Sequence, residues 1–589
     1  MLRNDRDTRP LLSAPAIGYQ STGSGPSAVR RRLLTALAAL AVAGLLSLPV
    51  LGVLESFLEP GGESWSRVLE QNLPQFIGNT LRLAFFTGLG VLFGGVATAW
   101  LVTMCRFPGR RWFEWLLILP LAAPAYIIAY VYTDFLQHSG AVQSLFRDVT
   151  GFGPRDYWFP NIRSLEGAVV VFTLVLYPYV YLLTRAAFLE QSVCVLEASR
   201  TLGRSAWASF WKVALPLARP AIAIGTALAL MEALADFGTV AHFGVPTFTT
   251  GIYRAWFDMS DPVSAGRLAS LLLLFVAVLM WLERHQRGVA KYHETTNVIR
   301  DLPRFRLRGW KAVAAFLICA LPVTFGFLLP VGLMLHLHAI NEHEIFSPRY
   351  LILLGNTFTL GSIAAVVAVS VSLFLAYSLR RIPIWPTRLA TRVASLGYAV
   401  PGSVIAVGIL IPLAGFDNAL DRWLRAEFGV SSGLLFTGTI AALIFAYVVR
   451  FLAVSLNTVE ASFSKISRNM DDAAVTLGAG ATRTFGRVLL PLMRGSVLTA
   501  LLLVFVDVMK ELPATLIMRP FNYDTLAVQA YRLASDERLA EAATPSLMIV
   551  GAGLLPVILL SRTIMRSRRG GRGSPQDQAT TIERRERRP

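Results

Sequence analysis

The sequence predicts an all-α integral membrane protein with about twelve transmembrane helices, arranged as two parallel six-helix repeats. Three observations lead to this fold class. Hydrophobic residues make up 54% of the 589 residues and charged residues only 16%, whereas soluble domains are about 25% charged. Long uncharged segments recur from residue 33 to residue 561. The two halves of the chain also share short motifs at a nearly constant offset. Together these features exclude a soluble globular protein.

Each predicted span is an apolar segment of about 20 residues, the length that crosses the hydrocarbon core of a bilayer. The first span follows Arg30, Arg31 and Arg32, but its apolar stretch is too long for a signal peptide. No small-residue cleavage site follows it before Glu55, which favours a signal-anchor helix. The predicted spans are 33–54, 80–104, 112–135, 166–190, 216–237, 265–283, 310–335, 357–379, 387–414, 433–456, 495–517 and 543–561.

Basic residues set the predicted orientation. The formal net charge is +18, and most Lys and Arg lie in alternate loops, including the segment from Arg450 to Arg494. This bias predicts that both termini are cytoplasmic. It also accounts for the basic charge without a nucleic-acid partner. The tails, residues 1–29 and 563–589, are polar or charge-dense and are expected to be disordered and cytoplasmic. The three cysteines lie far apart and predict neither a disulfide framework nor a zinc site.

An internal repeat defines the domain organisation. Residues 197–203 resemble residues 472–478, at an offset of 275. Further matches at offsets of 275 to 277 are Val213 with Val488, Pro216 with Pro491, Pro124 with Pro401, and residues 78–80 with 355–357. Six spans per copy make the two copies cross the membrane in the same sense, as a parallel repeat. We therefore predict a first repeat at 30–284, a polar cytoplasmic linker at 285–309 and a second repeat at 310–562.

Both repeats carry a loop with a shared helix–turn–helix pattern. A short helix ends at a glycine, which can adopt the left-handed conformation of a helix end, and a proline then restarts the chain into the next span. The first copy contains Glu197, Ala198, Gly203, Leu215 and Pro216; the second contains Asp472, Ala473, Gly478, Leu490 and Pro491. An ordinary polar loop is the alternative, but a second copy at one offset argues against it.

These loops resemble the E-A-A-x3-G-x9-I-x-L-P signature of the permease subunits of binding-protein-dependent ABC importers. The departures are Ser199 for Ala, Asp472 for Glu, and Val for Ile in both copies. The resemblance implies an inner-membrane, multi-pass transport subunit whose two loops dock into two copies of a cytosolic ATPase. It also implies an external, periplasmic binding protein that delivers the substrate.

The chain has no G-x-x-x-x-G-K-[ST] motif, so it has no phosphate-binding loop of its own. We expect it to be no enzyme and to carry no cofactor, with ATP and Mg²⁺ bound by the ATPase partner. Residues 119–134, 234–257 and 510–543 resemble the fused two-domain ferric-iron transport permeases. Thiamine or phosphonate import by the same mechanism is the alternative within this superfamily. An ion-gradient-driven secondary transporter is an alternative of another class, which the parallel repeat alone permits.

Four carboxylates in the spans predict a transport pathway. Glu232 and Asp236 lie four residues apart in the fifth span, and Asp507 and Glu511 occupy the matched positions in the eleventh, beside Lys510. Spacing of i and i+4 places each pair on one helix face. Charges inside a membrane are costly and often line a polar path, and carboxylate oxygens suit a hard cation. The alternative is that these residues serve gating or helix packing without contacting a cation.

Three weaker patterns receive simpler interpretations. His336, His338 and His343 cluster at an outer span end but lack a matched ligand set, which disfavours a metal site. Residues 415–428 form an amphipathic segment that is expected to lie along the outer surface against lipid rather than to dock the binding protein. An interfacial aromatic belt is favoured over ferric-iron ligation for Tyr126, Tyr130, Tyr177, Tyr179 and Tyr253.

Overall fold

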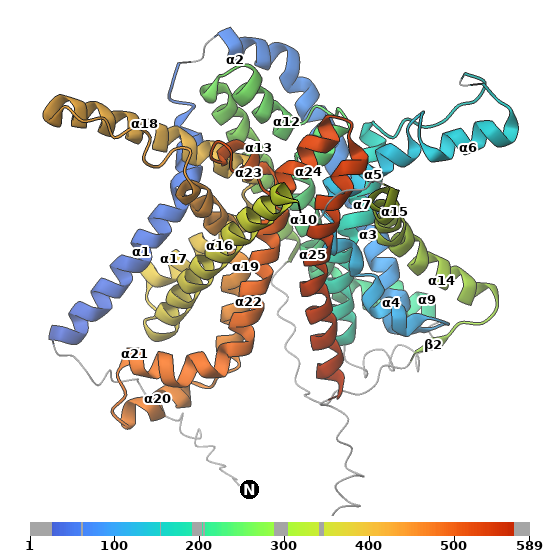
Figure 1. Cartoon of the computed structure of the whole chain (residues 1–589). Coiled ribbons are helices and arrows are strands. Elements are labelled where there is room, and N and C mark those ends of the chain that lie inside the picture. Colours follow the sequence, from blue (N-terminus) through green and yellow to red (C-terminus); the bar gives the residue numbers. More distant parts are fainter. Residues whose placement is uncertain are drawn as a thin grey trace, which may run out of the picture.

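The chain folds into a bundle of long helices, as the computed structural model shows for residues 26–60, 63–153, 155–190, 203, 206–287, 304–340 and 347–569 (Figure 1). Eleven helices are long and apolar enough to cross a membrane, or twelve if a bent pair counts as one span. Among the described residues, the only strands are β1 (Cys105–Arg106) and β2 (Phe305–Arg306), which pair in parallel. The predicted all-α membrane fold is confirmed.

The two halves repeat much of the same order of elements. Short 3₁₀ turns (η2 and η6) and π-helical turns (η3 and η7) lie at corresponding places, whereas η1, η4 and η5 have no counterpart among the described residues. The first half contains α1 (Pro26–Glu55), α2 (Glu63–Arg67), η1 (Val68–Asn72), α3 (Leu73–Met104), α4 (Arg110–Leu116), η2 (Leu119–Ala122), α5 (Ala125–Leu136), α6 (Ala141–Thr150), α7 (Leu165–Glu190), α9 (Ala206–Ser209), η3 (Phe210–Ala214), α10 (Leu215–Ala235), α11 (Gly238–His242), α12 (Phe248–Tyr253), η4 (Arg254–Asp258) and α13 (Pro262–Arg287). The second half contains α14 (Trp310–Val323), η5 (Thr324–Leu328), α15 (Leu329–Ile340), α16 (Pro348–Arg381), α17 (Trp385–Leu396), η6 (Gly397–Ala399), α18 (Gly402–Phe428), α19 (Ile440–Ser464), α20 (Arg468–Thr476), α21 (Ala481–Thr484), η7 (Phe485–Leu489), α22 (Leu490–Lys510), α23 (Pro513–Met518), α24 (Leu526–Ser535) and α25 (Leu539–Arg569).

The third span of each repeat is broken. We predicted continuous spans at 112–135 and 387–414, but each consists of a short helix, a 3₁₀ turn and a second helix. The break falls at Pro124 in one copy and Pro401 in the other. A proline disfavours the helical conformation of the residue before it, and both preceding residues are accordingly extended. In the first repeat the two parts meet at 90°.

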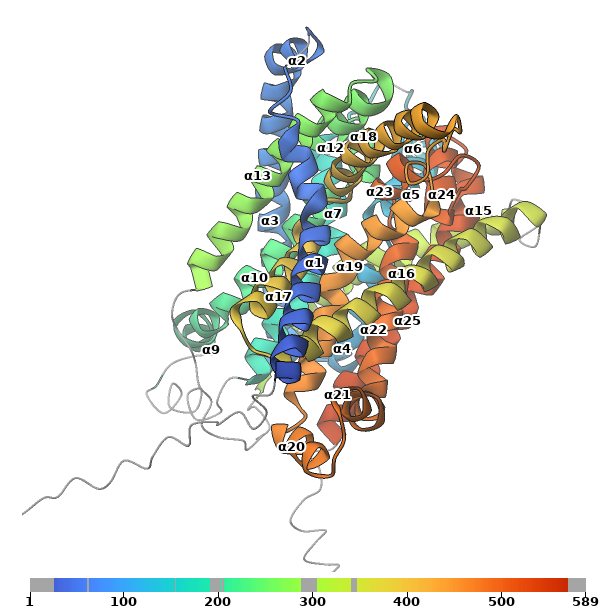
Figure 2. The same cartoon turned by 90° about the vertical axis from the view of Figure 1, so that its left-hand side faces the viewer.

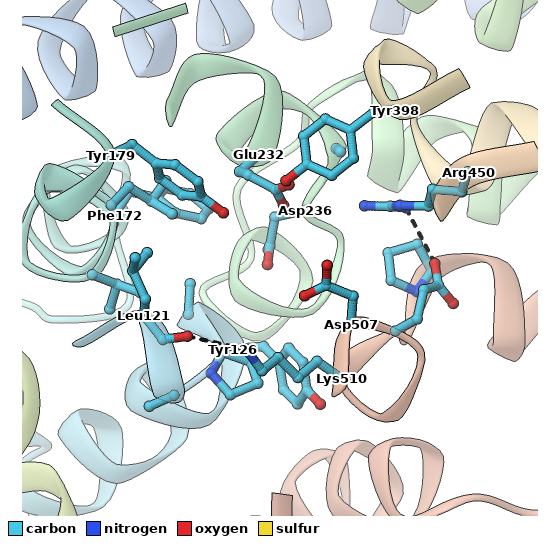
Figure 3. A pocket seen from close by; sticks show the side chains of 18 of the residues that line it. Leu121, Tyr126, Phe172, Tyr179, Glu232, Asp236, Tyr398, Arg450, Asp507 and Lys510 are labelled. Carbon is cyan, nitrogen blue, oxygen red and sulfur yellow. Dashed lines mark hydrogen bonds and ion pairs between the residues drawn. The ribbon is translucent and has the colours of Figure 1, made fainter. Parts of the chain in front are cut away.

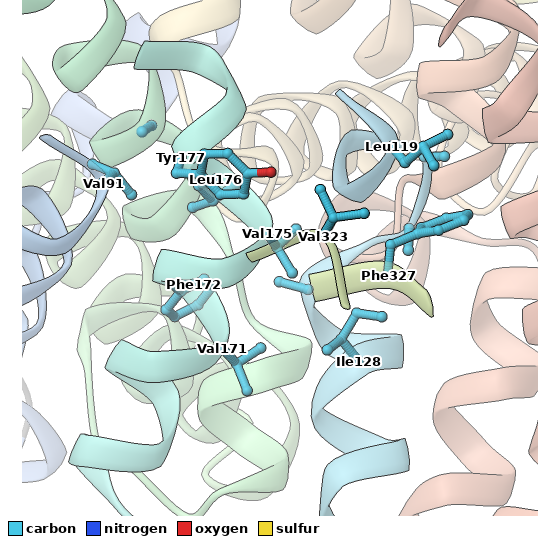
Figure 4. Close-up of a cluster of buried hydrophobic side chains, with 14 of the residues drawn as sticks. Val91, Leu119, Ile128, Val171, Phe172, Val175, Leu176, Tyr177, Val323 and Phe327 are labelled. Atoms are coloured by element: carbon cyan, nitrogen blue, oxygen red, sulfur yellow. The ribbon is translucent and has the colours of Figure 1, made fainter. Parts of the chain in front are cut away.

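The first helix of each half packs on the opposite half. Helix α1 lies against α17 and α18, and α14 and α15 lie against α3, α4 and α5. Figure 4 shows Val323, the last residue of α14, and Phe327 of η5 among side chains of α5 and α7. Figure 2 shows α1 alongside α17 from the other direction. Each hydrophobic core contains helices from both repeats, so packing does not divide the chain into two separate units. The domain boundaries 30–284 and 310–562 therefore stay a prediction.

The contact between α1 and α18 is backbone to backbone. A Cβ atom at Gly52 would overlap the carbonyl oxygen of Gly408, and one at Gly408 would overlap the carbonyl oxygen of Pro49. By contrast, Gly44 lies on the same helix with open space around its Cα. Small residues permit such close helix packing in membranes.

We predict that Gly52→Val destabilises the protein by about 1–3 kcal/mol, because the added side chain forces α1 away from α18. Gly44→Val is the matched control on the same helix and should have little effect. Thermal unfolding of the purified chain in detergent measures both. Equal melting temperatures for the two variants would contradict the packing of α1 on the second half.

Candidate functional site

A cavity of about 140 Å³ lies where the two halves meet (Figure 3). All four carboxylates that the sequence indicated line it, two from each repeat. Its ionisable and tyrosine lining consists of Glu232, Asp236, Asp507, Glu511, Arg450, Lys510, Tyr126, Tyr179 and Tyr398. The structure therefore brings together residues that are separated by about 275 positions in the chain.

The helices that carry the carboxylates end at the cavity. Helix α10 stops at Ala235 and α22 at Lys510, so Asp236 and Glu511 have extended backbones. Our placement of each pair on one helix face is therefore wrong for these two residues, and the predicted span 495–517 is two helices, α22 and α23. The reason is that the amides of the next short helix need acceptors. Asp236 accepts a hydrogen bond of 2.8 Å from the Thr239 amide.

Glu511 is engaged on all sides. Its side chain accepts hydrogen bonds from the amides of Ala514, at 2.9 Å, and Thr515, at 3.0 Å. It also pairs with Arg450, at 3.2 Å between Nη1 and Oε1. Glu511 is 4% exposed and Arg450 is 8% exposed. This geometry favours the packing alternative for Glu511, although its role in the pathway stays a prediction.

Glu232 and Asp507 face the cavity from the last turns of α10 and α22 (Figure 3). Both are half-buried. Glu232 accepts a hydrogen bond of 2.5 Å from the hydroxyl of Tyr398 in η6. Asp507 accepts no hydrogen bond from any residue that the structure describes. These two carboxylates, together with that of Asp236, are the acidic groups available to a cargo.

Two hydrogen bonds join the halves across the cavity in a matched way. Tyr398 of the second half bonds to Glu232 of the first. Lys510 of the second half donates from Nζ to the carbonyl oxygen of Leu121 in η2, at 3.1 Å. Leu121 and Tyr398 are counterparts in the repeat, 277 residues apart. Each 3₁₀ turn therefore contacts the end of the helix that carries the opposite half's carboxylates.

Sequence reasoning missed Arg450 and Tyr398 and misplaced several tyrosines. We took Arg450 as the edge of a cytoplasmic loop, but it lies in the middle of α19 and is buried. The signal was a single Arg inside an apolar run. The aromatic-belt interpretation is wrong for most of the tyrosines, because Tyr126, Tyr130, Tyr177 and Tyr253 are at most 5% exposed within the bundle. Tyr177, for example, donates to the carbonyl oxygen of Leu117 at 2.9 Å.

The remaining sequence candidates lie away from the cavity. His338 contacts the hydroxyl of Thr544 at 3.0 Å, and His343 lies outside the described residues. Among the described residues, no three His, Cys, Asp or Glu side chains are grouped to hold a metal ion. Residues 415–428 are the end of α18, which extends sideways from the bundle (Figure 1).

The second coupling loop, residues 465–489, forms the expected helix–turn–helix. Helix α20 contains Asp472 and Ala473 and ends at Gly478, whose φ is +78°. The amides of Gly478 and Ala479 bond back to the carbonyls of Val475 and Ala474, both at 2.9 Å, which is a Schellman helix end. Leu490 and Pro491 then open α22. The loop lies at one end of the bundle (Figure 1).

The first coupling loop is described only in part. Glu197 and Ala198 lie outside the described residues. Gly203 has a φ of +75°, which matches Gly478. Leu215 and Pro216 open α10 as Leu490 and Pro491 open α22. The roles of all these residues in coupling stay predictions.

Comparison with known proteins identifies the class. The family model for the binding-protein-dependent transport system inner membrane component matches the chain twice, at residues 89–287 and 352–566. The chain therefore belongs to this family. It is a multi-pass inner-membrane transport subunit, and the predicted recognition as a permease with two fused domains is confirmed.

Similar proteins span most of this chain or one part of it. The chain is 26% identical over 523 residues to the Fe(3+)-transport system permease protein FbpB 2 of Haemophilus influenzae, covering 88% of this chain and 96% of that protein. It is 24% identical to the ferric transport system permease protein FbpB of Actinobacillus pleuropneumoniae, covering 79% and 68%. The molybdenum transport system permease protein ModB of Escherichia coli is 29% identical, covering 34% of this chain and 90% of ModB.

We predict that Glu511→Ala lowers stability by about 3–5 kcal/mol, because it leaves Arg450 buried without its partner. Asp507→Ala, in the same cavity but at a carboxylate that accepts no hydrogen bond from the described residues, should cost less than about 1 kcal/mol. Adding Arg450→Met to Glu511→Ala should recover part of the loss. Chemical or thermal unfolding in detergent measures all three variants. A larger loss for Asp507→Ala than for Glu511→Ala would overturn this division of roles.

Proposed function

We propose that this chain is the membrane-spanning subunit of an ATP-driven importer that moves ferric iron from an external binding protein into the cytoplasm. The observation that carries the proposal is the cavity at the repeat interface, lined by four carboxylates from the two halves. The names of two relatives that span most of the chain, both ferric-transport permeases, support the same cargo.

The charges of the lining favour a multivalent cation. Glu511 and Arg450 neutralise one another, and the ammonium group of Lys510 is bonded to a backbone carbonyl. The three remaining carboxylates, Glu232, Asp236 and Asp507, outnumber the one positive charge of Lys510, so the formal net charge of the lining is negative. Coulomb attraction scales with the charge of the ion, so a trivalent cation is attracted three times as strongly as a monovalent one. An anionic cargo such as a phosphonate would be repelled.

ATP hydrolysis takes place on a partner. The chain contains no phosphate-binding loop, so ATP and Mg²⁺ bind to two copies of a cytosolic ATPase. The second coupling loop offers this partner apolar side chains, because Leu477 is 87% exposed and Val475 is 63% exposed. Exposed apolar groups that cluster on one loop are typical of a protein interface. The two termini lie on the same, cytoplasmic side, in keeping with the basic loops.

The two halves alternate between inward- and outward-facing states. Closure of the ATPase dimer draws the coupling loops together and rocks one half against the other. The hydrogen bonds from Tyr398 to Glu232 and from Lys510 to Leu121 cross the interface, so they break as the cavity opens. A cation that binds Glu232 and Asp507 takes the place of the Tyr398 hydroxyl at Glu232 in the open state.

We predict that Glu232→Gln and Asp507→Asn each reduce iron uptake by roughly tenfold or more, a loss of about 1.4 kcal/mol of interaction with the passing ion. The exposed carboxylate variant Glu537→Gln is the control and should transport normally. Radio-iron uptake into cells with equal membrane levels of each variant is the measurement. Normal uptake by a variant with Glu232, Asp236, Asp507 and Glu511 all amidated would show that they serve packing or gating. Thiamine uptake by the wild type in place of iron would assign the function to the alternative.

We predict that Gly478→Asp prevents the ATPase from binding or being driven, and that Gly203→Asp has the same effect in the first repeat. A side chain at these left-handed positions costs about 1–2 kcal/mol and introduces charge at the docking surface. Gly480→Asp is the matched control, since Gly480 has a φ of −69° and open space around it. Co-purification of the ATPase with each variant tests the idea. Full recovery of ATPase with the Gly203→Asp/Gly478→Asp double variant, with transport intact, would refute it.

A further inference from the structure

The end of helix α16 holds the second coupling loop from both sides. Arg380 donates to the carbonyl oxygens of Phe463 at 2.7 Å, Ile466 at 3.0 Å and Ser467 at 3.2 Å, and it pairs with Asp471 at 2.5 Å. These bonds fix the connection that leads into α20. One turn earlier on the same helix, Tyr377 donates to the carbonyl oxygen of Ala481 at 2.9 Å, beyond the turn.

An aromatic contact accompanies this attachment and is duplicated in the first repeat. The ring of Tyr377 packs on Phe463, at 6.4 Å between centroids, and on Phe485, at 5.0 Å. At the matched positions, Trp100 of α3 packs on Phe188 at 5.6 Å and on Phe210 at 4.6 Å. Phe463 precedes the second coupling loop and Phe485 lies near its end, and Phe188 and Phe210 are their counterparts in the first repeat. Both loops are therefore clamped at their base by one aromatic side chain.

The arginine is not duplicated, because the counterpart of Arg380 is Thr103. In its place the end of the inter-repeat linker contacts this part of the first repeat. Arg304 donates from Nε to the carbonyl oxygen of Thr103 at 3.3 Å, and β2 pairs with β1, which begins two residues after Thr103. The Leu307 amide donates to the Arg106 carbonyl oxygen at 3.0 Å. The ring of Phe305 adds a third aromatic contact to Trp100, at 6.4 Å.

We propose that Arg304, Phe305 and Leu307 are positioning residues for the first coupling loop, in the role that Arg380 has for the second. The proposal rests on the proposed docking of an ATPase on these loops. A push on a loop moves the transmembrane helix behind it only if the two are joined rigidly. The second loop has an ionic fork for this purpose, and the first has a strand pair and tilted or edge-on aromatic contacts. The end of the linker then helps to position the first coupling loop. The two ATPase docking sites are stabilised by different interactions, ionic in the second half and strand pairing with aromatic contacts in the first.

Hydrogen exchange on the purified full-length chain in lipid nanodiscs tests the proposal without the ATPase. Phe305→Ala should speed amide exchange at least tenfold in the segments that flank the first loop, residues 185–190 and 206–214, and leave residues 465–489 unchanged. Arg380→Ala should do the reverse. Two matched controls lie next to these residues, Arg306→Ala on β2 and Arg381→Ala on α16, both with exposed side chains. Phe305→Trp, which keeps an aromatic ring against Trp100, should restore slow amide exchange at the first loop. Equal exchange at the first loop in Phe305→Ala and Arg306→Ala would overturn the proposal.

A second measurement separates positioning from a general loss of structure. In the complex with its ATPase and binding protein, Phe305→Ala and Arg380→Ala should each raise the ATP consumed per iron imported several-fold, while the KM for ATP stays that of the wild type. The milder variant Phe305→Leu should show a smaller rise in the same direction. A loss of ATP hydrolysis and transport in equal proportion would contradict a positioning role. Failure of the wild-type chain to bind any ATPase would refute the proposed function. The hydrogen-exchange experiment would still test the positioning of the loop, because it does not require the ATPase.

Discussion

The structure depends on one constraint of the bilayer, that every backbone polar group inside it must find a partner within the protein. Helices α10 and α22 end inside the bundle, and the short helices that follow them begin with amides that need acceptors. Asp236 and Glu511 supply those acceptors. The same broken ends bring Glu232 and Asp507 to the repeat interface. The acidic cavity is thus a consequence of how interrupted helices are capped, and a cation path is what such a lining can offer.

The two repeats share their carboxylates but not their cations. Arg450 and Lys510 both come from the second repeat, and their counterparts in the first are Val175 and Ala235. Arg450 neutralises Glu511, whereas Asp236 at the matched position accepts a hydrogen bond from the Thr239 amide of its own half. A fused chain can differentiate its halves in this way because each sequence is present once. The coupling loops show the same divergence, with Arg380 on one side and the linker on the other.

Local patterns in the sequence predicted the membrane fold, the parallel repeat and the turn at Gly478, because span length, motif spacing and the left-handed glycine are local properties. The helix break at Glu511 was missed although Lys510, Glu511 and Pro513 mark it, since apolar residues resume in α23 and the whole run was taken as one span. The packing of α1 on the second half depends on contacts between Gly52 and Gly408, which are distant in sequence. The burial of Arg450 depends on its ion pair with Glu511, 61 residues away. Pairings of this kind are tertiary, and one sequence read alone does not display them.

The central claim is that cargo passes between Glu232 and Asp507 at the interface of the two halves. Its most direct test is a structure of the complete transporter, stopped with cargo inside by a hydrolysis-deficient ATPase, with the iron located by anomalous scattering at its absorption edge. We predict a peak within bonding distance of the carboxylates of Glu232 and Asp507, with the Tyr398 hydroxyl displaced from Glu232. An iron peak elsewhere in the membrane region, with the Tyr398–Glu232 and Lys510–Leu121 hydrogen bonds intact, would contradict the account.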